Sequence, residues 1–346
     1  MKKLNFKNLI VNISLLLVTT LICTVLLMFV IEVRYFFQMK QHLSYTWHDP
    51  NTQFDPELGW SPVLHRTVNY PDWGMLSSNS HGFRSAEIDQ NKKQIIVLGD
   101  SVAWGAGVSD TETFPYYLDE MVSNLDYQVS NLAVSGYDLG QYYLFLKRHI
   151  DKFNNLKQVI LVICPQNDLI CTRRNECYGK RKPLFQITNN DLILVNQNIK
   201  KYCLRNIFSK SYFLSGYWAF QGIIGKFLSK ISGDKTLDSQ ESLAVSLMLL
   251  QKIYELVVSH NAKLLIILSP SRDDFLEKTS YLQWLEYSMN KIKLKDFDFI
   301  SYVDVIIKDT TLDINNLYLE SDQVHFSKTG NMILAKTTYD YLVQSL

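Results

Sequence analysis

Short apolar runs recur along the chain from residue 91 onwards, and turn-forming residues bound each of them. Continuous apolar runs of about four to eight residues are typical of strands that are buried on both faces of a sheet. On this basis we predict β-strands at 94–99, 127–133, 158–164, 262–270 and 299–305.

Longer segments with apolar positions at helical spacing lie between and after these strands. They predict α-helices at 113–125, 138–153, 239–260 and 327–346. Thr113 and Pro115 suit the start of the first helix, and either Ser239 or Ser242 would cap the third. Strands that alternate with helices predict an α/β domain, in which helices cover both faces of a central parallel sheet.

Two regions depart from this alternation. Residues 34–90 are rich in turn formers, and we predict an irregular connecting segment that packs against the main domain. Residues 169–238 form an insertion between the third and fourth strands. Within the insertion, 182–197 predicts a β-hairpin around an Asn-Asn turn, and 215–231 predicts an amphipathic helix.

The N-terminal segment is apolar enough to cross a membrane. No charged residue occurs from position 8 until Glu32, and a bilayer core needs about 20 apolar residues. A cleaved signal peptide is the alternative, but its apolar core is usually shorter, and no small-x-small cleavage site follows this run. We therefore predict a tail at 1–8 and an uncleaved transmembrane anchor at 9–33.

Basic residues indicate the orientation of this anchor. Three lysines and the terminal amine precede the apolar run, whereas Arg34 and Lys40 follow it. Because positive charge is retained in the cytoplasm, the tail is predicted to be cytoplasmic and the rest of this single-pass protein extracytoplasmic. The formal net charge of +1 offers no basic face for nucleic acid.

Export would place four cysteines in an oxidising compartment, where disulfides persist. Cys164, Cys171, Cys177 and Cys203 allow three complete pairings. We favour Cys171 with Cys177, because these two flank a short loop. The cysteine spacing matches no zinc pattern and no histidine lies nearby, so we expect neither a metal nor a cofactor.

Polar residues gather where the predicted strands end, which is where α/β sheets bind ligands. The first strand ends in Gly99-Asp100-Ser101, the second in "NLAVSGYD", the third in "PQND", and "ESDQVHFSKTG" precedes the last helix. Each sequence alone also fits an ordinary turn or helix cap. Their joint occurrence at strand ends favours a catalytic site.

The residue types match the needs of acyl transfer. A serine hydroxyl such as Ser101 becomes a nucleophile when a base takes its proton, and the imidazole of His325 suits that task. Asp322 would fix the imidazole tautomer. The amides of Ser101 and Gly136 and the side chain of Asn167 would stabilise the oxyanion.

At these four blocks the sequence resembles the SGNH subgroup of GDSL-type esterases and lipases, over residues 91–346. The matching residues are Ser101, Gly136, Asn167 and His325, with Asp322 completing an Asp-x-x-His pattern. The resemblance implies a flavodoxin-like three-layer fold and hydrolysis or transfer of an acyl ester. The upstream "ELGW" and "SHGFRS" and the predicted hairpin resemble membrane-anchored bacterial members.

Two positions depart from the family pattern. Valine replaces the usual leucine after Gly-Asp-Ser, and Pro165 stands where glycine is usual before Asn167. We expect Asp100 and Asp168 to brace their loops by hydrogen bonds. Trp104 is predicted to line the acyl pocket, with core packing as the alternative.

Three functions remain open. The first is a serine esterase that cleaves an O-acetyl or other short acyl ester of a glycan or lipid. The second is an O-acyltransferase that modifies an envelope or exported polysaccharide, because the same groups serve whether water or a sugar hydroxyl attacks the acyl-enzyme. The third is a non-catalytic envelope scaffold, against which the presence of all five active-site residues argues.

Overall fold

The structure is a computed structural model, and it describes residues 11–24, 26–28, 30, 51–178, 180–199, 235–273, 297–302, 312–320 and 322–345. The chain divides into two units, one of Met1–Asp49 with Tyr202–Lys235 and one of Pro50–Lys201 with Thr236–Leu346. The bounds predicted for the anchor, the connecting segment and the insertion remain predictions. The helix predicted at 215–231 lies outside the described residues.

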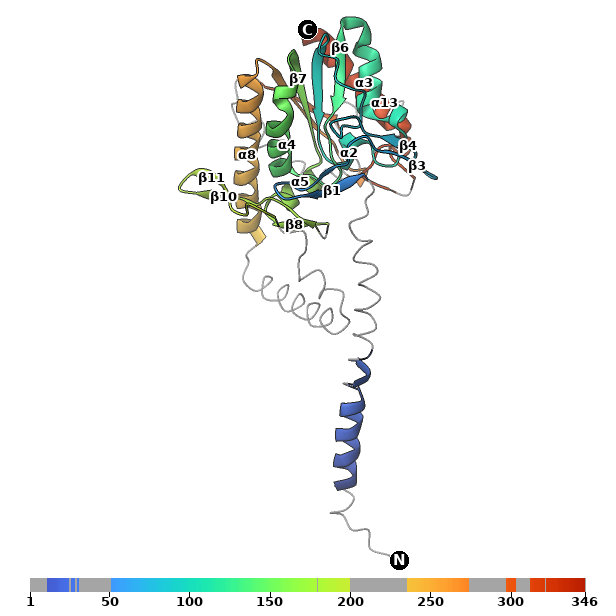
Figure 1. The fold of residues 1–346 in the computed structure, drawn as a ribbon, viewed down its shortest axis with the longest axis vertical. Coiled ribbons are helices and arrows are strands. Elements are labelled where there is room, and N and C mark those ends of the chain that lie inside the picture. Colours follow the sequence, from blue (N-terminus) through green and yellow to red (C-terminus); the bar gives the residue numbers. More distant parts are fainter. Residues whose placement is uncertain are drawn as a thin grey trace, which may run out of the picture. The chain divides into compact units, whose positions relative to one another are not determined.

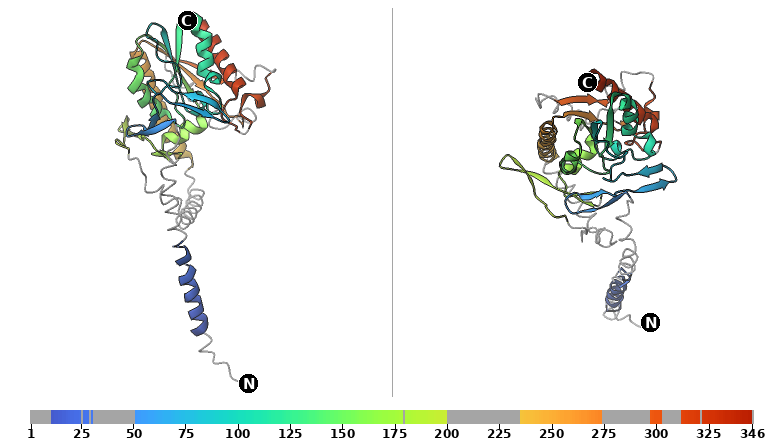
Figure 2. Two further views of the ribbon diagram at one scale, coloured as in Figure 1. Left: turned by 45° about the vertical axis from the view of Figure 1, so that its right-hand side comes forward. Right: turned by 45° about the horizontal axis from the view of Figure 1, so that its top comes forward.

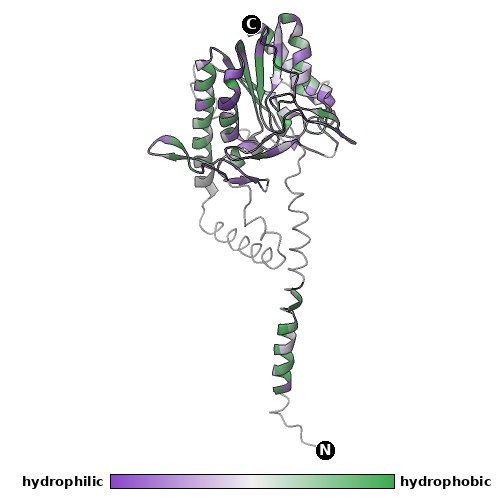
Figure 3. Cartoon of the chain, viewed as in Figure 1, coloured by the Kyte–Doolittle hydropathy of each residue, from purple (hydrophilic) through white to green (hydrophobic). Residues whose placement is uncertain are grey.

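The first unit contains an apolar helical segment. Val11–Met28 has a mean hydropathy of 2.4, and its side chains are exposed. Figure 3 shows that apolar residues dominate this helix. By length and composition it is able to span a membrane, and a signal sequence has the same properties.

A five-stranded parallel sheet forms the centre of the second unit (Figure 1). Its strands are β5 (Lys93–Leu98), β6 (Tyr127–Asn131), β7 (Leu156–Ile163), β12 (Lys263–Leu268) and β13 (Phe297–Ser301). They lie in the order β13-β12-β7-β5-β6, and every neighbouring pair is parallel. If the five strands are numbered along the chain and the sheet is read from β6 to β13, this order is 2-1-3-4-5, which is the flavodoxin-like arrangement. The predicted fold class is confirmed.

Helices cover both faces of this sheet, as Figures 1 and 2 show. On one face lie α3 (Phe114–Val122) and α13 (Lys328–Ser345), and on the other lie α4 (Leu139–His149) and α8 (Lys235–Ser259). Shorter helices are α2 (Ser101–Trp104), α5 (Pro165–Thr172) and α12 (Ile314–Leu317), with 3₁₀ turns at Asp110–Glu112, Ser123–Leu125 and Ile150–Lys152.

The core lies between the sheet and these helices. Side chains from alternate positions of the strands, such as Ile95 and Val97, pack with Phe114 and Leu118 of α3 and with Leu334 of α13. All five are at most 1% exposed. Because both faces of the sheet are covered in this way, its strands read as continuous apolar runs in the sequence.

The helix caps follow the prediction in one case and contradict it in another. The Thr113 side chain accepts a hydrogen bond from the Tyr116 N–H at the start of α3, as expected. The prediction for α8 is wrong, because that helix begins at Lys235, ahead of both Ser239 and Ser242. Serine inside a helix reduces stability only slightly, so its presence alone does not mark a helix start. It acts as a cap only where its own backbone is not helical.

The prediction that residues 34–90 are irregular is wrong for much of that segment. It contains two antiparallel hairpins, formed by β1 (Thr52–Asp55) with β2 (Gly59–Pro62) and by β3 (Thr67–Tyr70) with β4 (Gly74–Ser77). Strands of four residues are too short for a clear alternation of apolar and polar positions. Arg148 of α4 binds Asp55, and Gln141 donates to the Leu58 carbonyl, so α4 anchors the first hairpin.

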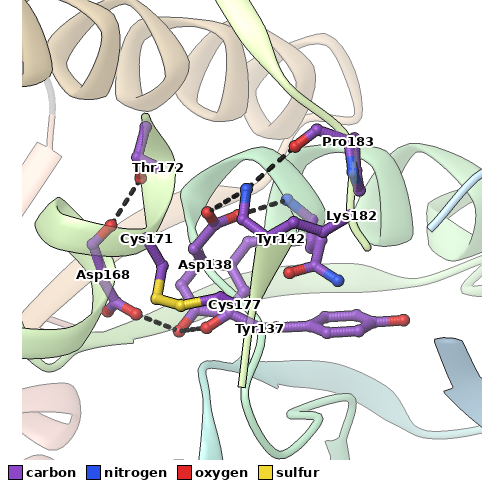
Figure 4. The surroundings of a disulfide bond; sticks show 10 residues. Tyr137, Asp138, Tyr142, Asp168, Cys171, Thr172, Cys177, Lys182 and Pro183 are labelled. Carbon is purple, nitrogen blue, oxygen red and sulfur yellow. Dashed lines mark hydrogen bonds and ion pairs between the residues drawn. A yellow bond between two sulfur atoms is a disulfide. The ribbon is translucent and has the colours of Figure 1, made fainter. Parts of the chain in front are cut away.

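The predicted hairpin and disulfide are both present. Strands β10 (Phe185–Thr188) and β11 (Asp191–Leu194) pair across Asn189 and Asn190, whose φ angles of 52° and 67° are left-handed. A two-residue turn with two positive φ angles is of type I′, which asparagine tolerates. Cys171 and Cys177 form a disulfide (Figure 4), with β8 (Glu176–Cys177) and β9 (Lys180–Arg181) just beyond. Cys203 lies outside the described residues.

Candidate active site

Ser101 lies at a sharp turn between β5 and α2. Gly99 has a φ of +157°, and a Cβ there would lie 2.6 Å from the Ala103 Cβ, so a side chain would not fit. The Asp100 carboxylate caps the helix by accepting a hydrogen bond from the Val102 N–H at 2.9 Å. The bracing role predicted for Asp100 is confirmed, and Ser101 becomes the first residue of α2.

Ser101, His325 and Asp322 form one hydrogen-bonded chain. The Ser101 Oγ lies 2.8 Å from His325 Nε2, and His325 Nδ1 lies 2.5 Å from Asp322 Oδ2. The serine and the histidine are 224 positions apart in the sequence. The structure therefore brings together the three groups that the sequence predicts to act in series.

Asp322 is held by its own loop, between α12 and α13. Its Oδ1 accepts hydrogen bonds from the backbone N–H groups of Val324 at 2.7 Å and His325 at 3.1 Å. Burial acts to raise the pKa of Asp322, but the hydrogen bonds from the His325 ring and from these two N–H groups bring the pKa below its ordinary value. The carboxyl is therefore ionised at neutral pH and able to accept the imidazole N–H.

Two arginines that the sequence reasoning missed hold the loops around this chain. The Arg272 guanidinium donates to the carbonyls of Leu319 at 2.8 Å and Asp322 at 2.9 Å. Arg84 donates to the carbonyls of Gly105 and Val108 beyond α2, at 2.7 and 2.8 Å. The "SHGFRS" motif contains Arg84, so it was a usable signal. No local pattern pointed to Arg272.

Trp104 ends α2 and packs against the apolar core, partly buried. The Arg84 guanidinium carbon lies 4.5 Å from the centre of its ring, and Arg84 also donates to its carbonyl at 3.0 Å. The expected contribution of Trp104 to an acyl pocket stays a prediction.

Gly136 lies in a tight turn after β6. The Tyr137 N–H donates to the Val134 carbonyl at 3.1 Å, and Gly136 has a φ of +78°. Together these define a type II turn, which favours glycine at this position. The Trp60 indole N–H donates to the Ser135 carbonyl at 3.1 Å. Because the Ser135–Gly136 peptide is trans, this bond directs the Gly136 N–H away from the indole.

The third strand end carries Asn167 and Asp168. Asn167 lies in the first turn of α5, immediately after β7, and its side chain is outside the described part of the structure. The Asp168 carboxylate accepts hydrogen bonds from the Cys164 N–H and the Tyr142 hydroxyl, each at 2.9 Å. Burial raises the pKa of Asp168 well above its usual range. Asp168 is a brace, as predicted.

These groups meet at one edge of the sheet. Ser101 follows β5, Gly136 follows β6 and Asn167 follows β7, and β5 lies between β6 and β7. This is the point where the strand order reverses, and ligands of doubly wound sheets bind there. Among the described residues, no group of three or more His, Cys, Asp or Glu side chains is placed to hold a metal ion.

Comparison with known proteins gives matches of structure only. No model of a known protein family matches the chain, and no curated protein does. A member of the lipolytic protein G-D-S-L family from Veillonella parvula is 11% identical, with a TM-score of 0.41 over 72% of this chain and 97% of its own. The described residues have the parallel α/β sheet and the strand order that the resemblance to the GDSL/SGNH hydrolases implies.

Two further solved structures are similar to this fold. A Bacillus subtilis protein is 13% identical, with a TM-score of 0.43, and the match covers 73% of this chain but only 57% of that protein. A carbohydrate esterase family 2 enzyme with a carbohydrate-binding domain, from Corynascus thermopiles (Myceliophthora fergusii), is 12% identical, with a TM-score of 0.39 over 75% and 68% of the two chains. At such identities the likeness concerns the fold alone.

Proposed function

We propose that the protein is a serine hydrolase that cleaves an acyl ester through an acyl-enzyme on Ser101. The observation that supports this proposal most directly is the Ser101–His325–Asp322 chain, with contacts of 2.8 and 2.5 Å. A hydroxyl in this position loses its proton to the imidazole as it attacks. A serine at a sharp strand-to-helix turn, a histidine and an ionised carboxylate in series are the groups that acyl transfer requires.

The proposed reaction has two stages. In the first, His325 takes the Ser101 proton, Ser101 attacks the ester carbonyl, and the imidazolium returns the proton to the leaving alkoxide. In the second, His325 takes a proton from water, which attacks the acyl-enzyme; the imidazolium then returns this proton to the leaving Ser101 Oγ, and the acid is released. Asp322 accepts the His325 Nδ1–H throughout and stabilises the imidazolium.

The oxyanion would be stabilised by donors from three strand ends. The Ser101 N–H belongs to the first turn of α2, where N–H groups have no partner within the helix. The Gly136 N–H is directed by the bond between Trp60 and Ser135. We assign the third donor to the Asn167 side chain, on the basis of its position at the start of α5.

We also propose that the enzyme is anchored and acts outside the cytoplasm, on an acylated glycan or lipid of the envelope. The disulfide between Cys171 and Cys177 supports an oxidising compartment. The apolar helical segment Val11–Met28 supports attachment to a membrane.

Labelling of the full chain in detergent tests the assignment of Ser101. We expect a fluorophosphonate to label Ser101, as mapped by peptide mass spectrometry, and the protein to hydrolyse p-nitrophenyl acetate. Ser101→Ala should abolish labelling and lower kcat by at least about a thousandfold. The control Ser123→Ala, at an exposed position beyond α3, should change neither. Labelling of another residue, or full activity of Ser101→Ala, would refute the proposal.

A further inference from the structure

Tyr178 covers the Gly136 turn from the side of the disulfide loop. A Cβ built on Gly136 would lie 3.3 Å from the Tyr178 Cδ2, so the tyrosine ring is in contact with this glycine. Tyr178 follows Cys177 directly in the sequence. Sequence reasoning assigned this residue no role, and the structure places it next to the expected oxyanion donor.

The segment that carries Tyr178 is held firmly on both sides. Before it, the Cys171–Cys177 disulfide closes the loop. After it, the Lys182 ammonium pairs with the Asp138 carboxylate at 2.7 Å, and both side chains are at most 1% exposed. Figure 4 shows the disulfide and this ion pair close to each other. Tyr178 therefore lies close in sequence to a covalent cross-link and to a buried ion pair, and such support helps a binding residue to keep its position.

The backbone at Tyr178 is strained. Its φ is +52°, in the left-handed region that a tyrosine rarely adopts. Such conformations cost about 1–3 kcal/mol and persist where the surrounding structure imposes them, often beside a functional site. Here the strain accompanies an aromatic ring that remains largely in solvent, because Tyr178 is 58% exposed.

Tyr178 lies beside the strand end that carries Gly136, and Ser101 follows the neighbouring strand β5. Partial burial, followed by the negative charges of Asp100 and Asp168, raises the pKa of its phenol above the ordinary value. A ligand that contacts both Tyr178 and the Gly136 turn would lie at the edge of the sheet that carries Ser101. The phenol stays protonated at neutral pH and can donate a hydrogen bond.

The surroundings of Tyr178 suit a polar ligand rather than an acyl chain. The loop contains basic residues instead of apolar ones, at Arg173, Arg174, Lys180 and Arg181. An aromatic face packs well against the C–H bonds of a sugar ring, while nearby polar groups bind its hydroxyls. A lipid tail would need a continuous apolar lining.

We propose that Tyr178 is a substrate-binding residue on whose exposed ring a sugar of an acylated glycan stacks, so that the ester reaches Ser101. This inference rests on the proposed function and names the class of substrate. It predicts that the tyrosine contributes more to binding of a glycan ester than to turnover of a small ester.

Binding and turnover together test this inference with the full chain in detergent. In the Ser101→Ala background, calorimetric titration with O-acetylated xylo-oligosaccharides and with O-acetylated oligogalacturonides measures binding without hydrolysis. We expect at least one of these probes to bind saturably, and Tyr178→Ala to weaken that binding at least fivefold. With Ser101 present, Tyr178→Ala should raise KM for that glycan by a similar factor and lower kcat/KM for p-nitrophenyl acetate by a smaller factor.

Tyr116→Ala is the matched control, since Tyr116 on α3 is another exposed tyrosine, at 37%. It should bind and turn over the glycan like the parent protein. The inference is wrong if neither probe binds, if Tyr178→Ala binds as tightly as the parent, or if it impairs both substrates equally. Failure of the proposed function can be told apart from failure of this inference. In that case the fluorophosphonate would not label Ser101, whereas the binding titration would still measure the contribution of Tyr178 to glycan binding.

Discussion

The nucleophile turn and the Gly136 turn lie at the same edge of the sheet, but they are held in different ways. At the first, the side chain of Asp100 caps the helix that Ser101 begins, and Asp322 likewise accepts N–H groups from its own loop. At the second, the peptide that presents the expected oxyanion donor is oriented by Trp60, which is 75 positions away in the sequence.

This difference shows that two parts of one site can have separate supports. The Ser101–His325–Asp322 chain depends on short-range caps within α2 and the loop before α13, together with the hydrogen bonds that Arg84 and Arg272 donate to these loops. The Gly136 turn depends on the first hairpin and on the disulfide loop, which lie outside the sheet. Damage to the hairpin should therefore impair oxyanion stabilisation while the hydrogen-bonded triad persists.

The largest effect is expected on the triad side of this comparison. Asp322→Asn keeps the shape of the side chain but removes its charge and allows the wrong imidazole tautomer. We expect kcat for p-nitrophenyl acetate to fall on the order of a thousandfold, with an unchanged thermal unfolding midpoint. Asp340→Asn, at an exposed position of α13, is the control. A kcat within tenfold of the parent would remove Asp322 from the mechanism.

An intermediate effect is expected on the Gly136 side. Trp60→Phe keeps an aromatic ring in this fully buried position but removes the N–H that binds the Ser135 carbonyl. A less well oriented donor should lower kcat about tenfold, less than complete loss of an oxyanion donor, with KM nearly unchanged. Trp73→Phe, an exposed tryptophan between β3 and β4, should have no effect. Equal kcat in the two variants would contradict a positioning role for Trp60.

The last effect concerns stability rather than rate, beneath the Gly136 turn. The His149 ring packs against those of Phe83 and Phe145, and Phe145 packs against Tyr137 of the turn. Burial, followed by the charge of Arg148, lowers the pKa of His149 from 6.5 to about 4. The unfolded chain therefore binds a proton below about pH 6.5 that the folded chain refuses until about pH 4.

This difference in proton binding sets the direction in which the free energy of unfolding changes with pH. Stability should fall as the pH drops from about 6.5 to 4, by on the order of 3 kcal/mol, and level off below. Urea unfolding of the full chain at several pH values measures this loss of stability. His149→Phe should flatten this part of the profile, whereas His260→Gln, which alters a histidine paired with Asp151, should retain it. An equal slope in parent and His149→Phe would show that other groups carry the pH dependence.

The sequence alone determined the architecture and the chemistry of the residues involved. Buried strands appear as apolar runs, the Asn189-Asn190 pair predicts its turn, and two cysteines flanking a short loop predict their own disulfide. Each of these signals is local, since it depends on residues within a few positions of one another. The five residues expected at the site were recognisable for the same reason, because each lies next to a strand end or a helix start.

Only the tertiary structure decided which of these local features meet. The contact between Ser101 and His325 spans 224 positions, and the contacts of Trp60 with Ser135 and of Arg272 with Leu319 also cross between distant segments. A single polar residue has no periodicity, so nothing near it in the sequence indicates its partner. The pairing follows from the strand order, which places the ends of β5, β6 and β7 side by side and brings the loop before α13 to the same edge.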